Sequence, residues 1–321
     1  MYKAFFELKQ YPFSLTPDPK FIVPSANYSE MLAGLCYGIE MAKGLMVLTG
    51  EVGTGKTTAL RWIIGRLDRG VRAAYLFNPH LSIEEFYHQV TEGLLLSPWA
   101  NKADLLSQIQ ALLKIRHSRG LRTIIIVDEA HELSDELLEE IRLLLNFESD
   151  SAKYLQIILT GQPELRERLR QPNLRQLKQR IAVRCVVPSI QDVAETERYI
   201  TERLRIAGAR ETKIFSQAAV DRIFHYSEGI PRQVNNLCDN AMIAAYGAGT
   251  RNIDKAIIEE IAENLDMLQG DVYIKCGEED PKPSLNVFDT IGNNDLLHVL
   301  DDGFSPSEQE SSGPRERKKM A

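Results

Sequence analysis

The stretch that decides the fold reads Gly50-Glu51-Val52-Gly53-Thr54-Gly55-Lys56-Thr57. It fits the P-loop pattern G-x-x-x-x-G-K-[ST], because a short apolar run at 45–49 precedes it and residues 57–62 suit the start of a helix. Such a loop turns its backbone N–H groups toward phosphate oxygens, and the helix N-terminus adds a partial positive charge. A chance match in a glycine-rich linker would lack this strand and helix, so the stretch predicts a nucleotide site.

The pattern also assigns roles to the end of the loop. Lys56 is expected to reach the β- and γ-phosphates of ATP, and the Thr57 hydroxyl is expected to bind Mg²⁺. The other residues expected to contact the nucleotide are Gly50, Glu51, Val52, Gly53, Thr54, Gly55 and Thr58.

A second stretch acts as the partner of the first and reads Thr123-Ile124-Ile125-Ile126-Val127-Asp128-Glu129. Its β-branched run predicts a parallel strand buried on both faces, so the two acids emerge at the carboxyl end, where doubly wound sheets bind ligands. In this Walker B interpretation Asp128 holds Mg²⁺ and Glu129 orients or deprotonates the attacking water. The alternative is a buried strand that ends in two solvated acids. Residues 128–131 also spell the DEAH of helicase motif II, but the remaining chain is too short for a second helicase unit.

Two further regions carry candidate residues with open roles. The apolar run 154–160 predicts a third strand. If this strand lies between the other two, Thr160 or Gln162 could sense the γ-phosphate, and a plain turn is the alternative. Residues 164–184 are rich in arginine, which is usual for a solvated helix face and would also suit a trans-acting arginine finger or contacts to phosphates.

Helical patterns fill much of the remaining chain. Expected helices in the first half are 28–43, 56–69, 82–96 and 102–118, with a strand at 72–77 and a capping box of Ser82 with Glu85. A small bundle is expected from helices at 191–207, 216–228, 231–248 and 253–266. Arg232 falls in the first turn of one of these helices, where it could swing onto a phosphate or remain solvated.

The two ends of the sequence differ from its body. Residues 1–24 are punctuated by proline and are expected to pack their Phe side chains over the next domain. Residues 269–321 are polar and charged, which predicts a disordered tail. An apolar island at 296–300 is either a docking peptide or a random hydrophobic patch.

Composition narrows the class of protein. The 321 residues are 44% hydrophobic and 26% charged, as in soluble globular proteins. The net charge of −7 is concentrated in residues 271–321, so the near-neutral body predicts no polyanion partner. Four scattered cysteines fit a reducing cytosol, and we expect neither a signal peptide nor a membrane span. The expected location is cytoplasmic.

The order of these motifs resembles the AAA+ ATPases, and more narrowly the ExeA-like group, named for general secretion pathway protein A. The resemblance covers about 1–268. Beyond the two Walker motifs it rests on stretches at 6–8, 12–19, 37–40, 128–131, 161–165 and 179–181.

This resemblance implies an α/β fold: a P-loop AAA+ core at 25–188, with a five-stranded parallel sheet between helices, then a small all-α lid at 189–268. It also implies an oligomer, as a nucleotide-dependent ring or filament. The roles that it suggests are sensor 1 for Gln162, the arginine finger for Arg180 with Arg175 as an alternative, sensor 2 for Arg232, and a polar switch for Asn78.

Two functions follow as hypotheses. Proteins of the ExeA-like group continue into a transmembrane helix and a peptidoglycan-binding domain, which this sequence does not contain. We therefore expect an ATPase that acts through a protein partner, peripheral to the inner membrane, in assembling a secretion system, a pilus or a surface polysaccharide machine. The alternative is a DNA-associated regulator similar to transposition ATPases, which the near-neutral body and the lack of a DNA-reading module disfavour.

Overall fold

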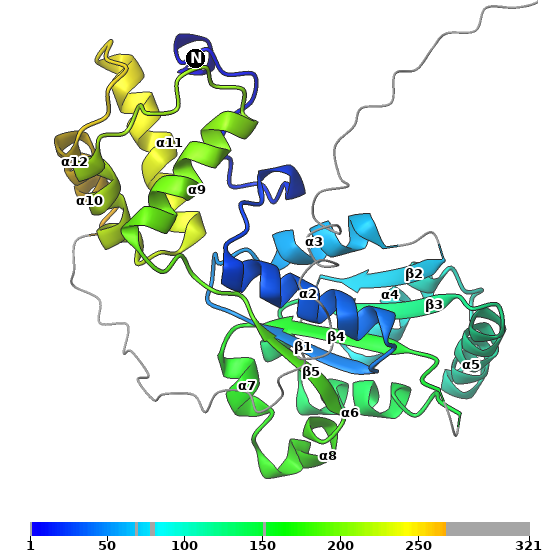
Figure 1. Cartoon of the computed structure of the whole chain (residues 1–321). Helices are drawn as coiled ribbons and strands as arrows, with labels where there is room; N and C mark the ends of the chain where they lie inside the picture. The colour runs from blue at the N-terminus through cyan, green and yellow to red at the C-terminus, as the bar shows by residue number, and fades with distance from the viewer. Residues whose placement is uncertain (1, 68–69, 78–80, 150–151, 268–321) are drawn as a thin grey trace, which may run out of the picture. The chain divides into compact units, whose positions relative to one another are not determined.

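A five-stranded parallel sheet forms the centre of the first two thirds of the chain (Figure 1). The computed structural model describes residues 2–67, 70–77, 81–149 and 152–267. The strand order is β2-β3-β4-β1-β5, which confirms the predicted sheet. The strands are β1 (Leu45–Thr49), β2 (Val71–Leu76), β3 (Arg122–Val127), β4 (Gln156–Gly161) and β5 (Ile181–Val186). Asn78 and the predicted tail, 269–321, lie outside the described residues.

Both faces of the sheet are covered by helices, which explains its uniformly apolar strands. Along β1, Leu45 and Val47 belong to one core cluster, whereas Met46 and Leu48 belong to another on the opposite face. One face is covered by α2 (Ala26–Glu40) and α3 (Lys56–Arg66). The other is covered by α4 (Ile83–Leu94), α5 (Lys102–Ser118), α6 (Asp135–Leu144), α7 (Glu164–Arg168) and α8 (Arg175–Lys178).

Local capping residues set where these helices begin. The predicted capping box is present, because the Ser82 side chain accepts from the Glu85 N–H while the Glu85 carboxylate accepts from the Ser82 N–H. Ser25 caps α2 by accepting from the Tyr28 N–H, so this helix starts two residues before the predicted boundary. Ser134 caps α6, a helix that the sequence analysis did not anticipate.

The chain continues into four helices with their own core. These helices are α9 (Val193–Ile206), α10 (Gln217–Ser227), α11 (Pro231–Gly247) and α12 (Lys255–Asn264). Their apolar faces share one cluster, as expected for a small bundle. Within the described ranges, no helix combines the length and apolar composition needed to cross a bilayer.

The N-terminal segment differs from expectation. It contains the short helix α1 (Tyr2–Phe5) and the helical turn η1 (Pro19–Phe21). Two other short helical turns lie later in the chain, η2 (Ala130–Glu132) and η3 (Pro172–Leu174). The segment contacts the sheet domain, where Arg61 of α3 donates to the Pro17 carbonyl at 3.1 Å. The side chains of Phe6, Phe13 and Phe21, however, are buried in the cluster of the four-helix bundle. The reason is Arg203 of α9, whose buried guanidinium donates to the backbone oxygens of Pro12 at 2.7 Å and Phe21 at 3.2 Å.

Candidate nucleotide site

The sheet topology brings the predicted motifs together. β4 lies between β3 and β1, and all three strands are parallel. The P-loop follows the carboxyl end of β1, Asp128 and Glu129 follow that of β3, and Gln162 follows that of β4. Because Thr49 is in register with Gly161, these segments leave the sheet at the same level. Gln162, directly after β4, therefore lies between the P-loop and the Asp128-Glu129 pair. This meets the condition stated for a residue that senses the γ-phosphate.

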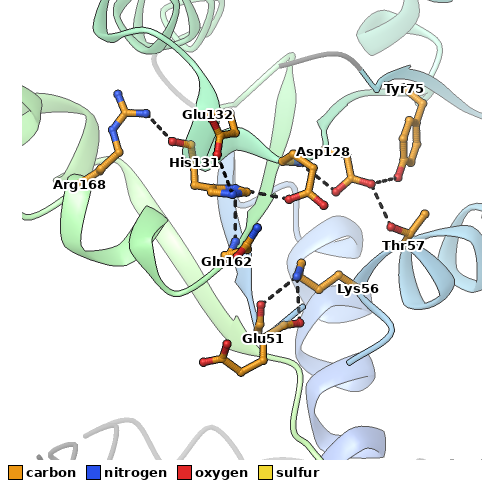
Figure 2. Close-up of polar contacts among 11 residues, drawn as sticks. Glu51, Lys56, Thr57, Tyr75, Asp128, His131, Glu132, Gln162 and Arg168 are labelled. Carbon is orange, nitrogen blue, oxygen red and sulfur yellow. Dashed lines mark hydrogen bonds and ion pairs between the residues drawn. The ribbon is translucent and has the colours of Figure 1, made fainter. Parts of the chain in front are cut away.

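The P-loop is held in shape by its own backbone. Gly53 and Gly55 have φ values of 83° and 100°, in the left-handed region that favours glycine. A Cβ at Gly53 would lie 2.6 Å from the Cβ of Arg232, so only glycine fits at this close approach. Inside the loop, Lys56 Nζ donates to the carbonyls of Gly50 at 2.8 Å and Glu51 at 3.1 Å (Figure 2). These donations keep the cation inside the loop.

Lys56 is a buried cation beside two acids. Burial lowers the pKa of its ammonium group below the usual value, while the charges of Glu129 and Asp128 oppose this shift. The carbonyls that Lys56 now contacts offset part of the cost of burying its charged ammonium group, and a phosphate group in their place would do the same. The site is thus suited electrostatically to an anion.

Asp128 lies at the centre of a small oxygen cluster. Its Oδ2 accepts from the Thr57 hydroxyl at 3.1 Å and from the Tyr75 hydroxyl at 2.6 Å, and its Oδ1 accepts from the Glu129 N–H at 3.0 Å (Figure 2). Burial, followed by the bond to Asp128, raises the pKa of Tyr75, so this phenol remains a donor. The hydroxyl of Thr57 and the carboxylate of Asp128 are hard oxygen donors within contact distance, which fits Mg²⁺.

Glu129 stands in an unusual conformation directly after the strand. Its φ of 51° lies in the left-handed region, which is uncommon for a residue other than glycine. Its Oε2 is buried without a hydrogen-bond donor and lies 3.4 Å from Nδ1 of His131. The side chain as a whole is 41% exposed and lines the cavity described below, so its carboxylate can accept a hydrogen bond from a water molecule there.

One cavity of about 420 Å³ joins most of the predicted residues. It is lined by Val52 to Thr58 of the loop and by Glu129, Gln162 and Arg232. The Arg232 N–H donates to the Gly53 carbonyl at 3.1 Å, so the first turn of α11 rests on the P-loop. Residues 14–18 and 21–23 of the N-terminal segment also line the cavity.

The candidate finger residues lie elsewhere. Arg180 precedes the amino end of β5, whereas the P-loop follows the carboxyl end of the parallel strand β1, so the two lie at opposite edges of the sheet. The Arg180 guanidinium donates to the Leu145 carbonyl at 3.3 Å and to Asn146 Oδ1 at 2.6 Å. Arg175, the alternative, is exposed at the start of α8. Neither arginine lines the cavity of its own chain.

Three residues around the site were missed by sequence reasoning. Tyr75 contacts Asp128, His131 contacts both Glu129 and Gln162, and Arg168 binds the turn that follows Glu129. Tyr75 carried a usable signal, because a hydroxyl near the carboxyl end of a strand beside β3 falls at the ligand edge of the sheet. Arg168 carried none, since in the sequence it is one of several arginines in the basic run 164–184.

Comparisons with known proteins identify an AAA domain and one relative. A sequence model of the AAA domain matches residues 39–169. General secretion pathway protein A of Aeromonas hydrophila is 41% identical over 258 residues, which cover 79% of this chain and 46% of the relative. The chain carries an AAA domain and is related to general secretion pathway protein A. It spans about half the length of that curated relative.

Two solved structures share the fold at low sequence identity. The Aeropyrum pernix ORC2 protein, in ADPNP-ADP complexes, has a TM-score of 0.60 and 16% identity, with 79% of this chain and 71% of that chain covered. Cdc6p from Pyrobaculum aerophilum has a TM-score of 0.59 and 16% identity, with coverage of 81% and 72%. These likenesses show that the overall fold is shared.

Proposed function

We propose that this AAA protein hydrolyses ATP in a magnesium-dependent reaction. The observation that carries the proposal is the contact of Thr57 with Asp128, made beside the buried Lys56 and the unpaired carboxylate oxygen of Glu129. One edge of the sheet thus brings together a cation for phosphates, two oxygen ligands for a metal and a carboxylate base. This combination is what phosphoryl transfer to water requires.

Each residue has a distinct task in this proposal. Lys56 exchanges its loop carbonyls for the β- and γ-phosphates, and the N–H groups of the loop bind the remaining phosphate oxygens. Thr57 and Asp128 would hold Mg²⁺, which supplies positive charge to the phosphates when bound. Glu129 accepts a hydrogen bond from the attacking water and orients it.

Gln162 and Arg232 complete the site within one chain. Both line the cavity, Gln162 from the end of β4 and Arg232 from the first turn of α11. We assign to them the sensing of the γ-phosphate, with Thr160 as the less suitable alternative to Gln162. Thr160 is completely buried and its Oγ1 makes no hydrogen bond, so it has no route to a ligand in this arrangement.

A second subunit is part of the proposal. Transition-state charge in such sites is commonly neutralised by an arginine, and neither Arg175 nor Arg180 reaches the cavity of its own chain. We therefore propose a nucleotide-dependent ring or filament in which one of them acts on the neighbour's ATP. From the relationship to general secretion pathway protein A, we propose that hydrolysis drives a secretion, pilus or surface-polysaccharide assembly from the cytoplasm, through a protein partner at the membrane.

Replacement of Lys56 by Ala tests the proposed reaction. We expect the variant to lose ATP binding and phosphate release together, because Lys56 supplies charge to the phosphates in both the ground state and the transition state. The matched control is Lys255→Ala, which removes an exposed lysine at the start of α12. Phosphate release and ATP titration are measured on the whole chain with Mg²⁺. Unaltered ATP affinity in Lys56→Ala would refute the role of this residue.

A further inference from the structure

The turn that follows Glu129 is held from behind by one arginine. Arg168, at the end of α7, donates to the carbonyls of His131 at 2.6 Å and Leu133 at 2.5 Å, and to Asp135 Oδ1 at 2.6 Å. A planar guanidinium can bind three acceptors in fixed directions at once, which an ammonium group on a flexible stem does less well. Figure 2 shows the contact between Arg168 and His131. The backbone of residues 131–133 is thus fixed to α7 and to the start of α6.

The imidazole of His131 occupies the space between two proposed site residues. Only 7% of this side chain is exposed, and a Cβ at Gly161 would approach its Nδ1 to 3.2 Å, so the ring is tightly enclosed. Nδ1 accepts from the Gln162 N–H at 3.5 Å and lies 3.4 Å from Glu129 Oε2. Nε2 faces Glu132 Oε1, also at 3.4 Å.

These contacts determine how the ring acts on Glu129. A neutral imidazole has one N–H and one acceptor nitrogen, and the nitrogen that accepts from Gln162 cannot also donate to Glu129. The proton therefore belongs on Nε2, toward Glu132. The enclosed ring, with Nδ1 3.4 Å from Glu129 Oε2, then limits the space into which the carboxylate can move, while Oε2 is left without a donor, as observed.

We propose that Arg168 and His131 form a positioning clamp for the proposed hydrolytic residue Glu129. Arg168 fixes the turn, and His131 fixes the spacing between Glu129 and the backbone of Gln162. This inference rests on the proposed function and adds two positioning residues to it. It also gives α7 a role, because this helix opens the arginine-rich segment 164–184, whose finger candidates would contact a neighbouring subunit. A partner that shifts α7 would therefore change the position of Glu129 in the same chain.

Variants of His131 test the clamp by the position of a single acceptor atom. Asn carries Oδ1 at the same number of bonds from Cα as Nδ1 of His, whereas the polar atoms of Gln lie one bond further. We expect His131→Ala and His131→Gln to lower kcat about tenfold or more, the size of one lost buried hydrogen bond, with KM for ATP within about twofold. His131→Asn is expected to recover most of kcat. Equal kcat in the Asn and Gln variants, or a rise in KM with kcat unchanged, would overturn the proposal.

Variants of Arg168 test the other half of the clamp. Arg168→Lys keeps the charge but cannot bind the three acceptors together, so it should lower kcat nearly as much as Arg168→Ala. The matched controls are Arg119→Ala and His225→Ala, at exposed positions after α5 and on α10, which should keep the wild-type kcat. Full activity in Arg168→Lys would show that charge alone, rather than the fixed turn, matters.

A measurement without turnover separates this inference from the proposed function. Hydrogen exchange of the Gln162 amide is followed by NMR in the nucleotide-free full chain. His131→Ala should speed this exchange about tenfold relative to the wild type, because the amide loses its acceptor, while His131→Asn should not. If the wild type releases no phosphate, the proposed function fails and the exchange rates still decide on the clamp. Exchange that is unchanged in His131→Ala would overturn it.

Discussion

Gly53→Ala is a sharp test of the contact between the P-loop and α11. The added Cβ would lie 2.6 Å from the Cβ of Arg232 and 3.2 Å from Cγ2 of Ile230. Carbon atoms pack at about 3.5–4.0 Å, so the first turn of α11 must retreat by about 1 Å. That retreat would stretch the hydrogen bond from the Arg232 N–H to the Gly53 carbonyl, now 3.1 Å long.

The size of the effect follows from two costs, one for the backbone conformation and one for the contact with α11. An alanine at the φ of 83° found for Gly53 costs roughly 1–2 kcal/mol. Overpacking adds about 1–3 kcal/mol unless the helix moves, in which case a hydrogen bond of about 0.5–1.5 kcal/mol is lost instead. We expect a penalty of roughly 1.5–5 kcal/mol on the arrangement that brings Arg232 to the nucleotide. This corresponds to a fall of about 10- to 4,000-fold in ATP affinity.

The assay is a calorimetric titration of ATP into the full chain, with Mg²⁺ present. Gly249→Ala is the matched control, since Gly249 has a φ of 67° and no atom within 4 Å of an added Cβ. The Gly249→Ala variant has the cost of an alanine at positive φ but no steric clash. It should therefore lose a little thermal stability and bind ATP like the wild type. Wild-type affinity in a folded Gly53→Ala chain would refute the reasoning, because the loop and α11 would then not touch in the state that binds ATP.

Two other predictions concern the steps after binding. Glu129→Gln should bind ATP with wild-type affinity and release no phosphate, because the amide still occupies the site but is a poor base; measurable turnover in this variant would count against the assignment. Arg180→Ala should regain part of its phosphate release when mixed with Glu129→Gln chains, because each variant supplies the group that the other lacks. Rescue of Arg175→Ala alone, with Arg180→Ala active by itself, would make Arg175 the finger.

The elements predicted best were those with local, repeated signals. The β-branched run before Asp128 and the glycines of the P-loop each identify a strand, a turn and an edge of the sheet without knowledge of distant residues. The position of β4 between β3 and β1 could be stated only as a condition. It depends on pairing between strands that are far apart in sequence, which a single sequence does not reveal.

Residues that act by binding the backbone of a distant segment could not be predicted from the sequence. Arg168 looks like its exposed neighbours, and only the fold shows that its guanidinium turns inward to the carbonyls of His131 and Leu133. The attachment of the N-terminal segment to the four-helix bundle was not predicted for a similar reason. Its partner is Arg203, about 190 residues away, and a buried arginine that binds backbone carbonyls has no local pattern.

Arg232 and Arg180 differ in whether they can reach the nucleotide site of their own chain. Arg232 reaches the P-loop from the four-helix bundle of the same chain, whereas Arg180 lies at the opposite edge of the sheet and cannot do so. A chain with only the first kind of arginine can bind ATP, but its site lacks the finger arginine that neutralises the additional charge developing during hydrolysis. Binding should therefore be a property of the single chain, while turnover should rise more steeply than linearly with protein concentration. A turnover rate per chain that is constant down to concentrations at which the chain is monomeric would exclude a contribution from a neighbour.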